Sequence, residues 1–196
     1  MSIDAPRKRA AILISGRGSN MLALIEAAED AHYPVEIAGV ISDKADAGGL
    51  ETARGHGIPA VAVPRGDYAS KADHEHALQA ELARLDPDIV CLAGFMRLLS
   101  AEFLEPWKGR IINIHPSLLP KYKGLDTHER AIEARDTVHG CSVHHVTAGM
   151  DDGPVIMQAE VPVLPDDTPE TLAARVLAEE HRMYPLALAE LARSAN

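Results

Sequence analysis

Short apolar runs alternate along this chain with longer segments in which apolar residues recur every three or four positions. Arg9–Ser15, Val35–Ser42 and Asp88–Ala93 have the length and composition of buried strands. Ser70–Leu85 and the segment from Thr168 to about Ser194 have the periodicity of amphipathic helices. Strands that alternate with helices are typical of an α/β domain, so we expect that class of fold.

The remaining pattern predicts the other elements. Further strands are expected at Ala60–Val63, Ile111–His115, Gly140–Thr147 and Val155–Val163, and further helices from Met21 to about Ala31, at Leu50–His56, shortly after Ser100 and at Thr127–Arg135. We expect His74 and His76 to be solvated on a surface helix, Thr127 to cap its helix, and Pro185 to kink or divide the last helix.

The stretch Ile111–Pro120 carries the most suggestive chemistry. Asn113 and His115 are two positions apart in an apolar strand, so their side chains point to the same face, and Pro116 should end the strand. A lone histidine at a strand end is more often structural than catalytic. An amide beside an imidazole, however, can hold an oxyanion and pass on a proton, which is what acyl transfer needs.

A glycine loop follows the first predicted strand. Gly16-Arg17-Gly18-Ser19-Asn20 leads directly into a helix, so its backbone N–H groups can face an anion such as a phosphate. Met21 stands where the dinucleotide fingerprint needs glycine, and no Gly-Lys-Ser/Thr follows. A single phosphate is therefore favoured, and a tight turn without a ligand is the alternative.

Asp151 is a third candidate. It lies in the turn-rich loop Ala148–Pro154, after a strand on which Ser142 and His144 share a face that we expect to look toward Asn113 and His115. A carboxylate near the imidazole would favour its protonated form. No serine or cysteine is placed as a nucleophile, so the attacking group would belong to the substrate. Arg97 could clamp a carboxylate, or it could be an ordinary surface arginine.

Composition narrows the function. The 196 residues suit one domain, and we expect a flexible leader over residues 1–8 and a single domain over 9–196. The net charge of -10 disfavours nucleic acid as a partner. Cys91 and Cys141 form no metal or redox motif, so no metal is expected. No signal peptide or membrane helix is predicted, so a cytoplasmic protein with small-molecule substrates is expected.

Four motifs together resemble the folate-dependent formyltransferase family, in particular its members that formylate glycinamide ribonucleotide. They are Ile14–Asn20, Ala93–Arg97, Asn113–Pro120 and Met150–Ile156. The resemblance covers nearly the whole chain and implies a Rossmann-like formyltransferase fold, with a mostly parallel central sheet flanked by helices. It implies transfer of a formyl group from 10-formyltetrahydrofolate, the cosubstrate, to the amine of N1-(5-phospho-D-ribosyl)glycinamide in purine (IMP) synthesis.

The same resemblance implies roles for individual residues. Asn113, His115 and Asp151 would form the catalytic trio, Gly18, Ser19 and Asn20 would bind the substrate phosphate, and Glu180 would contact its ribose or glycinamide portion. The folate site would comprise Lys71, Met96, Arg97, Leu98, Leu99, Asn113, Thr147, Ala148, Gly149, Met150 and Asp151. The protein would be a monomer or a homodimer.

Other functions stay open. A formyltransferase or deformylase acting on another acceptor shares the His-Pro-Ser-Leu-Leu-Pro segment, although the extra domain expected of such enzymes is not seen in this sequence. A non-catalytic folate- or phosphate-binding protein on the same fold is the alternative outside enzymes. The loop Lys121–His128 also departs from the family pattern, which expects proline before Gly124 and often histidine at position 126.

Overall fold

The computed structural model describes residues 6–194, so the first five residues of the expected leader lie outside it. The chain divides into two compact units. Unit 1 contains the residues up to Arg97 together with those from Leu188 on, and unit 2 contains Leu98–Ala187.

The strands of unit 1 form a parallel arrangement. Their order is β3-β2-β1-β4, and each pair of neighbours is parallel. The strands are β1 (Lys8–Ile14), β2 (Val35–Ser42), β3 (Ala60–Ala62) and β4 (Ile89–Leu92). The last five residues of β1 are buried, as expected for a strand covered on both faces. The predicted strands of this unit are confirmed, with ends that differ by at most one residue.

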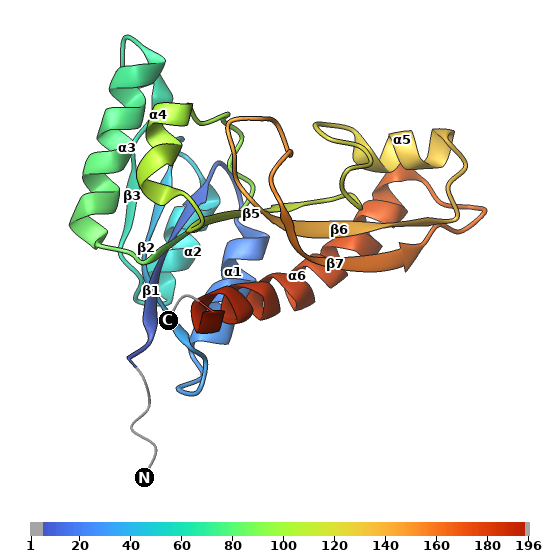
Figure 1. The fold of residues 1–196 in the computed structure, drawn as a ribbon, viewed down its shortest axis with the longest axis horizontal. Helices are drawn as coiled ribbons and strands as arrows, with labels where there is room; N and C mark the ends of the chain where they lie inside the picture. The colour runs from blue at the N-terminus through green and yellow to red at the C-terminus, as the bar shows by residue number, and fades with distance from the viewer. Residues whose placement is uncertain (1–5, 195–196) are drawn as a thin grey trace. The chain divides into compact units, whose positions relative to one another are not determined.

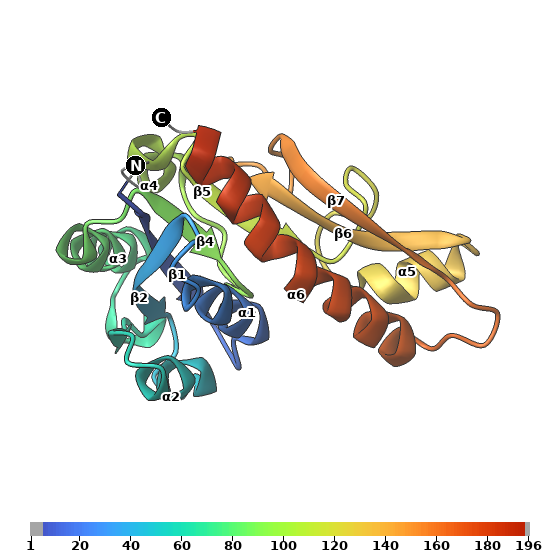
Figure 2. The same ribbon diagram turned by 90° about the horizontal axis from the view of Figure 1, so that it is seen from below.

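Helices cover both faces of the unit 1 strands, with α1 and α2 on one face and α3 on the other (Figure 2). They are α1 (Ser19–Ala28), α2 (Gly48–Gly55) and α3 (Lys71–Leu85), with a short 3₁₀ turn at Arg65–Asp67. Glycines allow the close packing. A Cβ at Gly39 would lie 2.6 Å from Leu85 Cδ2 of α3, and one at Gly49 of α2 would lie 2.4 Å from Ile14 Cδ1.

The prediction that His74 is solvated is wrong, whereas His76 is exposed as expected. His74 lies on the buried face of α3, with Glu75 and Leu78, and its Nε2 donates to the backbone carbonyl of Val63 over 2.8 Å. The hydrogen bond satisfies the buried ring nitrogen, so a histidine can occupy a position that the polar sequence pattern assigned to solvent.

The strands of unit 2 are antiparallel and consecutive, in the order β5-β6-β7. They are β5 (Ile111–His115), β6 (Val138–His145) and β7 (Val155–Pro162), and both views draw α6 alongside β6 and β7 (Figure 1). β6 starts two residues before the predicted strand and ends at His145, two residues before its predicted end.

The helices of unit 2 correct two predictions. They are α4 (Ala101–Leu104), the 3₁₀ turn Glu105–Trp107, α5 (Thr127–Glu133) and the part of α6 (Pro169–Ser194) that ends at Ala187. Thr127 is not the cap of α5: Asp126 precedes the helix with φ 57°, and the Thr127 hydroxyl donates to the carbonyl of Pro116 over 2.6 Å. The predicted division at Pro185 is wrong, because α6 continues through this residue.

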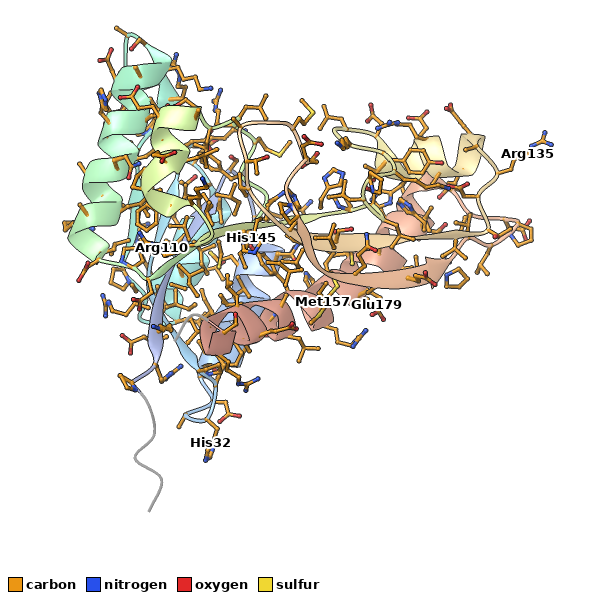
Figure 3. The ribbon with its side chains drawn as sticks, viewed as in Figure 1. His32, Arg110, Arg135, His145, Met157 and Glu179 are labelled. Carbon is orange, nitrogen blue, oxygen red and sulfur yellow. The ribbon has the colours of Figure 1, made fainter. Side chains whose placement is uncertain are left out.

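None of the described helices is long and apolar enough to cross a membrane. Arg135 follows α5 with φ 55° and projects outward from unit 2 (Figure 3).

Candidate active site

The register between β5 and β6 brings together four polar side chains. Asn113 lies opposite His144, and His115 lies opposite Ser142. Residues directly opposite in an antiparallel pair share a face, so all four side chains lie on one face of the strands. β5 ends at His115, immediately before Pro116. The expectation that Ser142 and His144 face the central strand is confirmed.

His115 is buried, and an acceptor stands at each of its ring nitrogens. Nε2 donates to the backbone carbonyl of Tyr122 over 2.8 Å, and Nδ1 lies 3.4 Å from Oδ2 of Asp151. A carboxylate and a carbonyl only accept hydrogen bonds, so both ring nitrogens of His115 lie beside acceptors. These two contacts set the orientation of the ring.

Asp151 is held in place by backbone contacts. Its φ is 47°, and its Oδ2 accepts a hydrogen bond from the backbone N–H of Gly124 over 2.9 Å. Gly153 allows the loop to fold tightly, because a Cβ there would lie 1.7 Å from the carbonyl oxygen of His145. The structure thus brings Asn113, His115 and Asp151 together on unit 2, and their catalytic roles stay a prediction.

His144 is a member of this cluster that the predicted catalytic set lacked. Its side chain is 3 % exposed, Asn113 Nδ2 lies 3.2 Å from its Nε2, and Oδ1 of Asp151 lies 3.7 Å from the same nitrogen. Burial lowers the pKa of the His144 imidazole. Alternation along the strand predicts the face on which His144 lies, but it does not predict the contact of His144 with Asn113.

Ser142, the fourth side chain, holds the segment that follows β5. Its hydroxyl donates to the carbonyl of Ser117 over 2.6 Å and accepts from the backbone N–H of Leu119 over 3.0 Å and from Gln158 Nε2 over 2.9 Å. All its hydrogen-bonding capacity is used within the protein. The Ser142 hydroxyl therefore serves to hold this segment.

The segment after Pro120 also reaches the cluster through Tyr122. The φ of Tyr122 is 53°, and its hydroxyl donates to Oδ2 of Asp136 over 2.6 Å. Lys121 Nζ contacts the same carboxylate at 3.0 Å. The hydrogen bonds from Tyr122 and Lys121 lower the pKa of Asp136, and the bond to Asp136 raises the pKa of Tyr122. These contacts hold Tyr122 in place, and its backbone carbonyl accepts the hydrogen bond from His115 Nε2.

Two histidines of unit 2, His128 and His139, lie close together. Nδ1 of His128 is 3.2 Å from Nε2 of His139. Burial lowers the pKa of His139 to about 4 and lowers that of His128 as well. This pair is not predictable from the sequence pattern, because residues 11 positions apart in a helix and a strand show no periodic relation.

The predicted phosphate loop lies in unit 1. Gly18 precedes α1 with φ 71°, in the left-handed region that favours glycine, and Ser19 and Asn20 are the first two residues of the helix. The backbone N–H of Gly49 donates to the carbonyl of Gly16 over 3.1 Å, which ties the loop to α2. The loop therefore has the strand, glycine turn and helix that the sequence predicted.

The predicted folate residues of unit 1 differ in their surroundings. Arg97 Nε donates to Oδ2 of Asp43 over 2.6 Å, and the Asp43 side chain is fully buried. Met96 is exposed, and its backbone N–H donates to the hydroxyl of Ser15. Lys71 is the first residue of α3, and its Nζ lies 3.8 Å from Oε1 of Glu75. Sequence reasoning did not find Asp43, the partner of Arg97.

The predicted folate residues of unit 2 are mostly exposed. Leu98, Thr147, Ala148, Gly149 and Met150 are exposed, whereas Leu99 is buried and could offer a ligand little but its backbone.

Glu180, expected to contact the substrate, is a buried residue of α6. Burial, and next the charge of Glu180, raise the pKa of Cys141 to about 12. Between residues 6 and 194, no group of three or more histidine, cysteine, aspartate or glutamate residues is arranged to hold a metal ion.

Comparison with known proteins adds to this geometry. The family model described as formyl transferase matches residues 8–188. The chain belongs to the formyl transferase family. Its phosphoribosylglycinamide formyltransferase relative from Escherichia coli is 47 % identical over 177 residues, which are 90 % of this chain and 84 % of that protein. The family resemblance inferred from the four motifs is thereby confirmed.

Another formyl transferase relative is the trifunctional purine biosynthetic protein adenosine-3 of Drosophila pseudoobscura, 48 % identical over 98 % of this chain. The match spans only 14 % of that longer protein.

Solved structures of the family show the same fold. The phosphoribosylglycinamide formyltransferase of Brucella melitensis is 57 % identical, with a TM-score of 0.92 over 95 % of this chain and 96 % of that one. Glycinamide ribonucleotide transformylase 1 of Symbiobacterium toebii is 46 % identical, with a TM-score of 0.93 over 96 % of this chain and 89 % of that one. The predicted α/β formyltransferase fold is confirmed.

Proposed function

We propose that this chain transfers a formyl group from 10-formyltetrahydrofolate to the amine of N1-(5-phospho-D-ribosyl)glycinamide in purine synthesis. The observation that carries the proposal is the cluster formed by β5, β6 and the loop after β6. In this cluster Nδ1 of His115 lies 3.4 Å from Oδ2 of Asp151, and His115 shares a face of β5 with Asn113. Family membership and the names of the relatives support the same reaction.

The chemistry follows from these side chains. The formyl carbon is supplied by the folate cosubstrate, and the acceptor amine forms a C–N bond with it. Asn113 donates an amide N–H to the resulting oxyanion, and imidazolium His115 stabilises the same charge. The Asp151 carboxylate lies 3.4 Å from Nδ1 of His115 and orients the ring. The C–N bond to the folate nitrogen then breaks, and that nitrogen leaves with a proton that a water can relay from the acceptor amine.

The substrate-binding residues are also part of the proposal. Gly18, Ser19 and Asn20 would hold the phosphate at the start of α1, where backbone N–H groups and the helix dipole favour an anion. Glu180 would contact the ribose or glycinamide portion. The folate would bind along Met96–Leu99 and Thr147–Asp151, with Arg97 near its glutamate or pterin end and Lys71 as a further basic contact.

We further propose a cytoplasmic enzyme that acts as a monomer or homodimer on small molecules, without metal, nucleic acid or membrane partners. Residues 9–196 would serve as one formyltransferase domain. The net charge of -10 supports the expectation that nucleic acid is not a partner.

The test is acceptor-dependent turnover. The purified protein is mixed with the 10-formyl folate, with and without glycinamide ribonucleotide, and the deformylated folate is followed by absorbance. The variant His115→Ala is run in parallel, with His76→Ala as its control, because His76 is an exposed histidine on α3. We expect turnover only with the acceptor, a loss of at least about 100-fold in kcat for His115→Ala, and none for the control.

Each other outcome identifies an alternative. Folate consumption without the acceptor would favour a deformylase. Turnover with a different amine would favour another formyltransferase. Binding of folate with no reaction in any variant would favour a non-catalytic binding protein.

A further inference from the structure

The imidazole of His144 lies between the Asn113 amide and the Asp151 carboxylate. Asn113 Nδ2 lies 3.2 Å from His144 Nε2, and Asp151 Oδ1 lies 3.7 Å from the same nitrogen. His144 is 2 % exposed, so water cannot readily replace either neighbour. One buried ring nitrogen therefore faces two of the three residues that we assign to catalysis.

The other ring nitrogen determines what this one can do. Nδ1 of His144 lies 2.9 Å from the backbone carbonyl oxygen of His145, and a carbonyl only accepts hydrogen bonds. Nδ1 must therefore carry a proton, and in the neutral ring Nε2 has a lone pair. The Asn113 amide N–H can donate to that lone pair, whereas the amide oxygen could not.

We propose that His144 is a positioning residue that acts through Asn113: as a neutral imidazole it accepts one N–H of the Asn113 amide, and so keeps the second N–H directed at the oxyanion of formyl transfer. This inference rests on the proposed function. An amide can turn by 180° about its last bond with little change in shape, so a fixed acceptor is needed to select one orientation.

The charge state of His144 decides the orientation. If Nε2 were protonated, it would donate to Asp151 Oδ1 or to the Asn113 oxygen, and the amide would turn its N–H groups away from their present direction. The charged or titratable groups whose electrostatic influence reaches the ring are Asp151, which favours the cation, and His115 and His145, which oppose it. Burial outweighs these and lowers the pKa of His144, so the neutral ring prevails at neutral pH.

A double-mutant cycle separates this role from simple packing. His144→Ala, Asn113→Ala and the double variant are compared with the unmodified protein for kcat and for KM of both substrates. Because removal of an oxyanion donor costs about 100- to 1000-fold in kcat, a misdirected donor should cost part of that, about 10- to 100-fold. We expect KM to change by less than about twofold.

Dependence on Asn113 is the decisive result. In the Asn113→Ala background, His144→Ala should change kcat by less than about twofold, because the group that it orients is gone. His144→Gln keeps an acceptor and should recover most of the lost kcat. His145→Gln is the matched control: it changes the next side chain along β6 (Figure 3), on the opposite face, and leaves in place the carbonyl that His144 uses.

A measurement independent of activity tests the tautomer. Long-range ¹H–¹⁵N correlation of the ring nitrogens in the unmodified protein should show Nδ1 protonated and Nε2 unprotonated at neutral pH, with the Nε2 shift changed in Asn113→Ala.

Two results would overturn the inference. One is an equal loss of kcat on His144→Ala in both backgrounds, and the other is a protonated Nε2 at neutral pH. If the protein showed no formyl transfer at all, the proposed function would fail, and the nitrogen shifts would still decide the hydrogen bond between Asn113 and His144.

Discussion

Arg97 Nε donates to Oδ2 of Asp43 over 2.6 Å, joining a half-exposed guanidinium to a fully buried carboxylate. Asp43 directly follows β2 and Arg97 lies in the segment after β4, so the bond links the segments that follow two strands of unit 1. A guanidinium held through Nε presents its two Nη groups as a fixed fork, which suits a carboxylate ligand. We therefore expect Asp43 to hold the Arg97 guanidinium in the orientation that the proposed folate site needs.

The substitution Asp43→Asn should raise the KM for the formyl folate by about five- to tenfold and change kcat by less than about twofold. The neutral amide holds the guanidinium less firmly, because a hydrogen bond between charged partners is worth about 1.5–3 kcal/mol and Arg97 is partly screened by solvent. Steady-state kinetics at varied folate concentration measures the effect. Asp46→Asn is the control, since it removes the same charge from an exposed position in the same loop. An unchanged KM in Asp43→Asn would contradict this role.

The His128–His139 pair should make stability depend on pH. His139 takes up a proton near pH 6.5 when unfolded, but burial lowers its folded pKa to about 4. Between these values the unfolded state binds more protons, so the contribution of His139 is fully present above about pH 6.5 and is lost as pH falls through about 4. At about 1.4 kcal/mol per pKa unit, the loss is on the order of 3 kcal/mol.

Urea unfolding at several pH values between 4 and 7 checks this. His139→Gln should flatten the dependence, because glutamine does not titrate in this range. His32→Gln, which changes a side chain that is 90 % exposed, should leave the dependence unchanged. An equally steep dependence in His139→Gln would show that other groups cause it.

The sequence predicted more of the fold than of the side-chain contacts. Apolar runs such as Val35–Ser42 gave the strands nearly to their ends, and the i, i+2 spacing placed Asn113 and His115 on one face. Those features depend on local periodicity. The pairing of Asn113 with His144 depends on which strand lies beside β5 and in what register, and that is set by tertiary packing rather than by local sequence.

The same limit explains His74 and Asp43. Both are polar residues of kinds that are mostly exposed in proteins, and each is buried beside one specific partner: the carbonyl of Val63 for His74 and the guanidinium of Arg97 for Asp43. Such partners lie 11 and 54 residues away along the chain, and single-sequence patterns do not reveal them.

Gly153→Ala should lower both stability and kcat. The new Cβ would lie 1.7 Å from the carbonyl oxygen of His145, so backbone must move, and Asp151 is only two residues away in the same loop. We expect a loss of about 1–3 kcal/mol in the free energy of unfolding and at least a tenfold loss in kcat. Thermal unfolding and steady-state kinetics measure the two effects.

The control for Gly153→Ala is Gly55→Ala. A Cβ at Gly55 meets no atom within 4 Å, and Gly55 is the last residue of α2. Alanine there should be neutral or stabilise the protein by up to about 1 kcal/mol. If Gly153→Ala behaved like Gly55→Ala, the close approach at His145 would not constrain the Asp151 loop.

Ser142→Ala should destabilise the segment that follows His115. Its buried hydroxyl donates to the Ser117 carbonyl and accepts from the Leu119 N–H, so alanine leaves both backbone groups without that partner. Loss of a buried hydrogen-bond partner costs about 1–3 kcal/mol, to be measured by urea unfolding. Because the segment begins directly after His115, to which we assign a catalytic role, kcat should fall by about three- to tenfold while a phosphate-binding measurement stays unchanged. Thr52→Ala, which removes an exposed hydroxyl from α2, should cost less than about 0.5 kcal/mol. Equal costs for the two substitutions would show that Ser142 does not hold this segment.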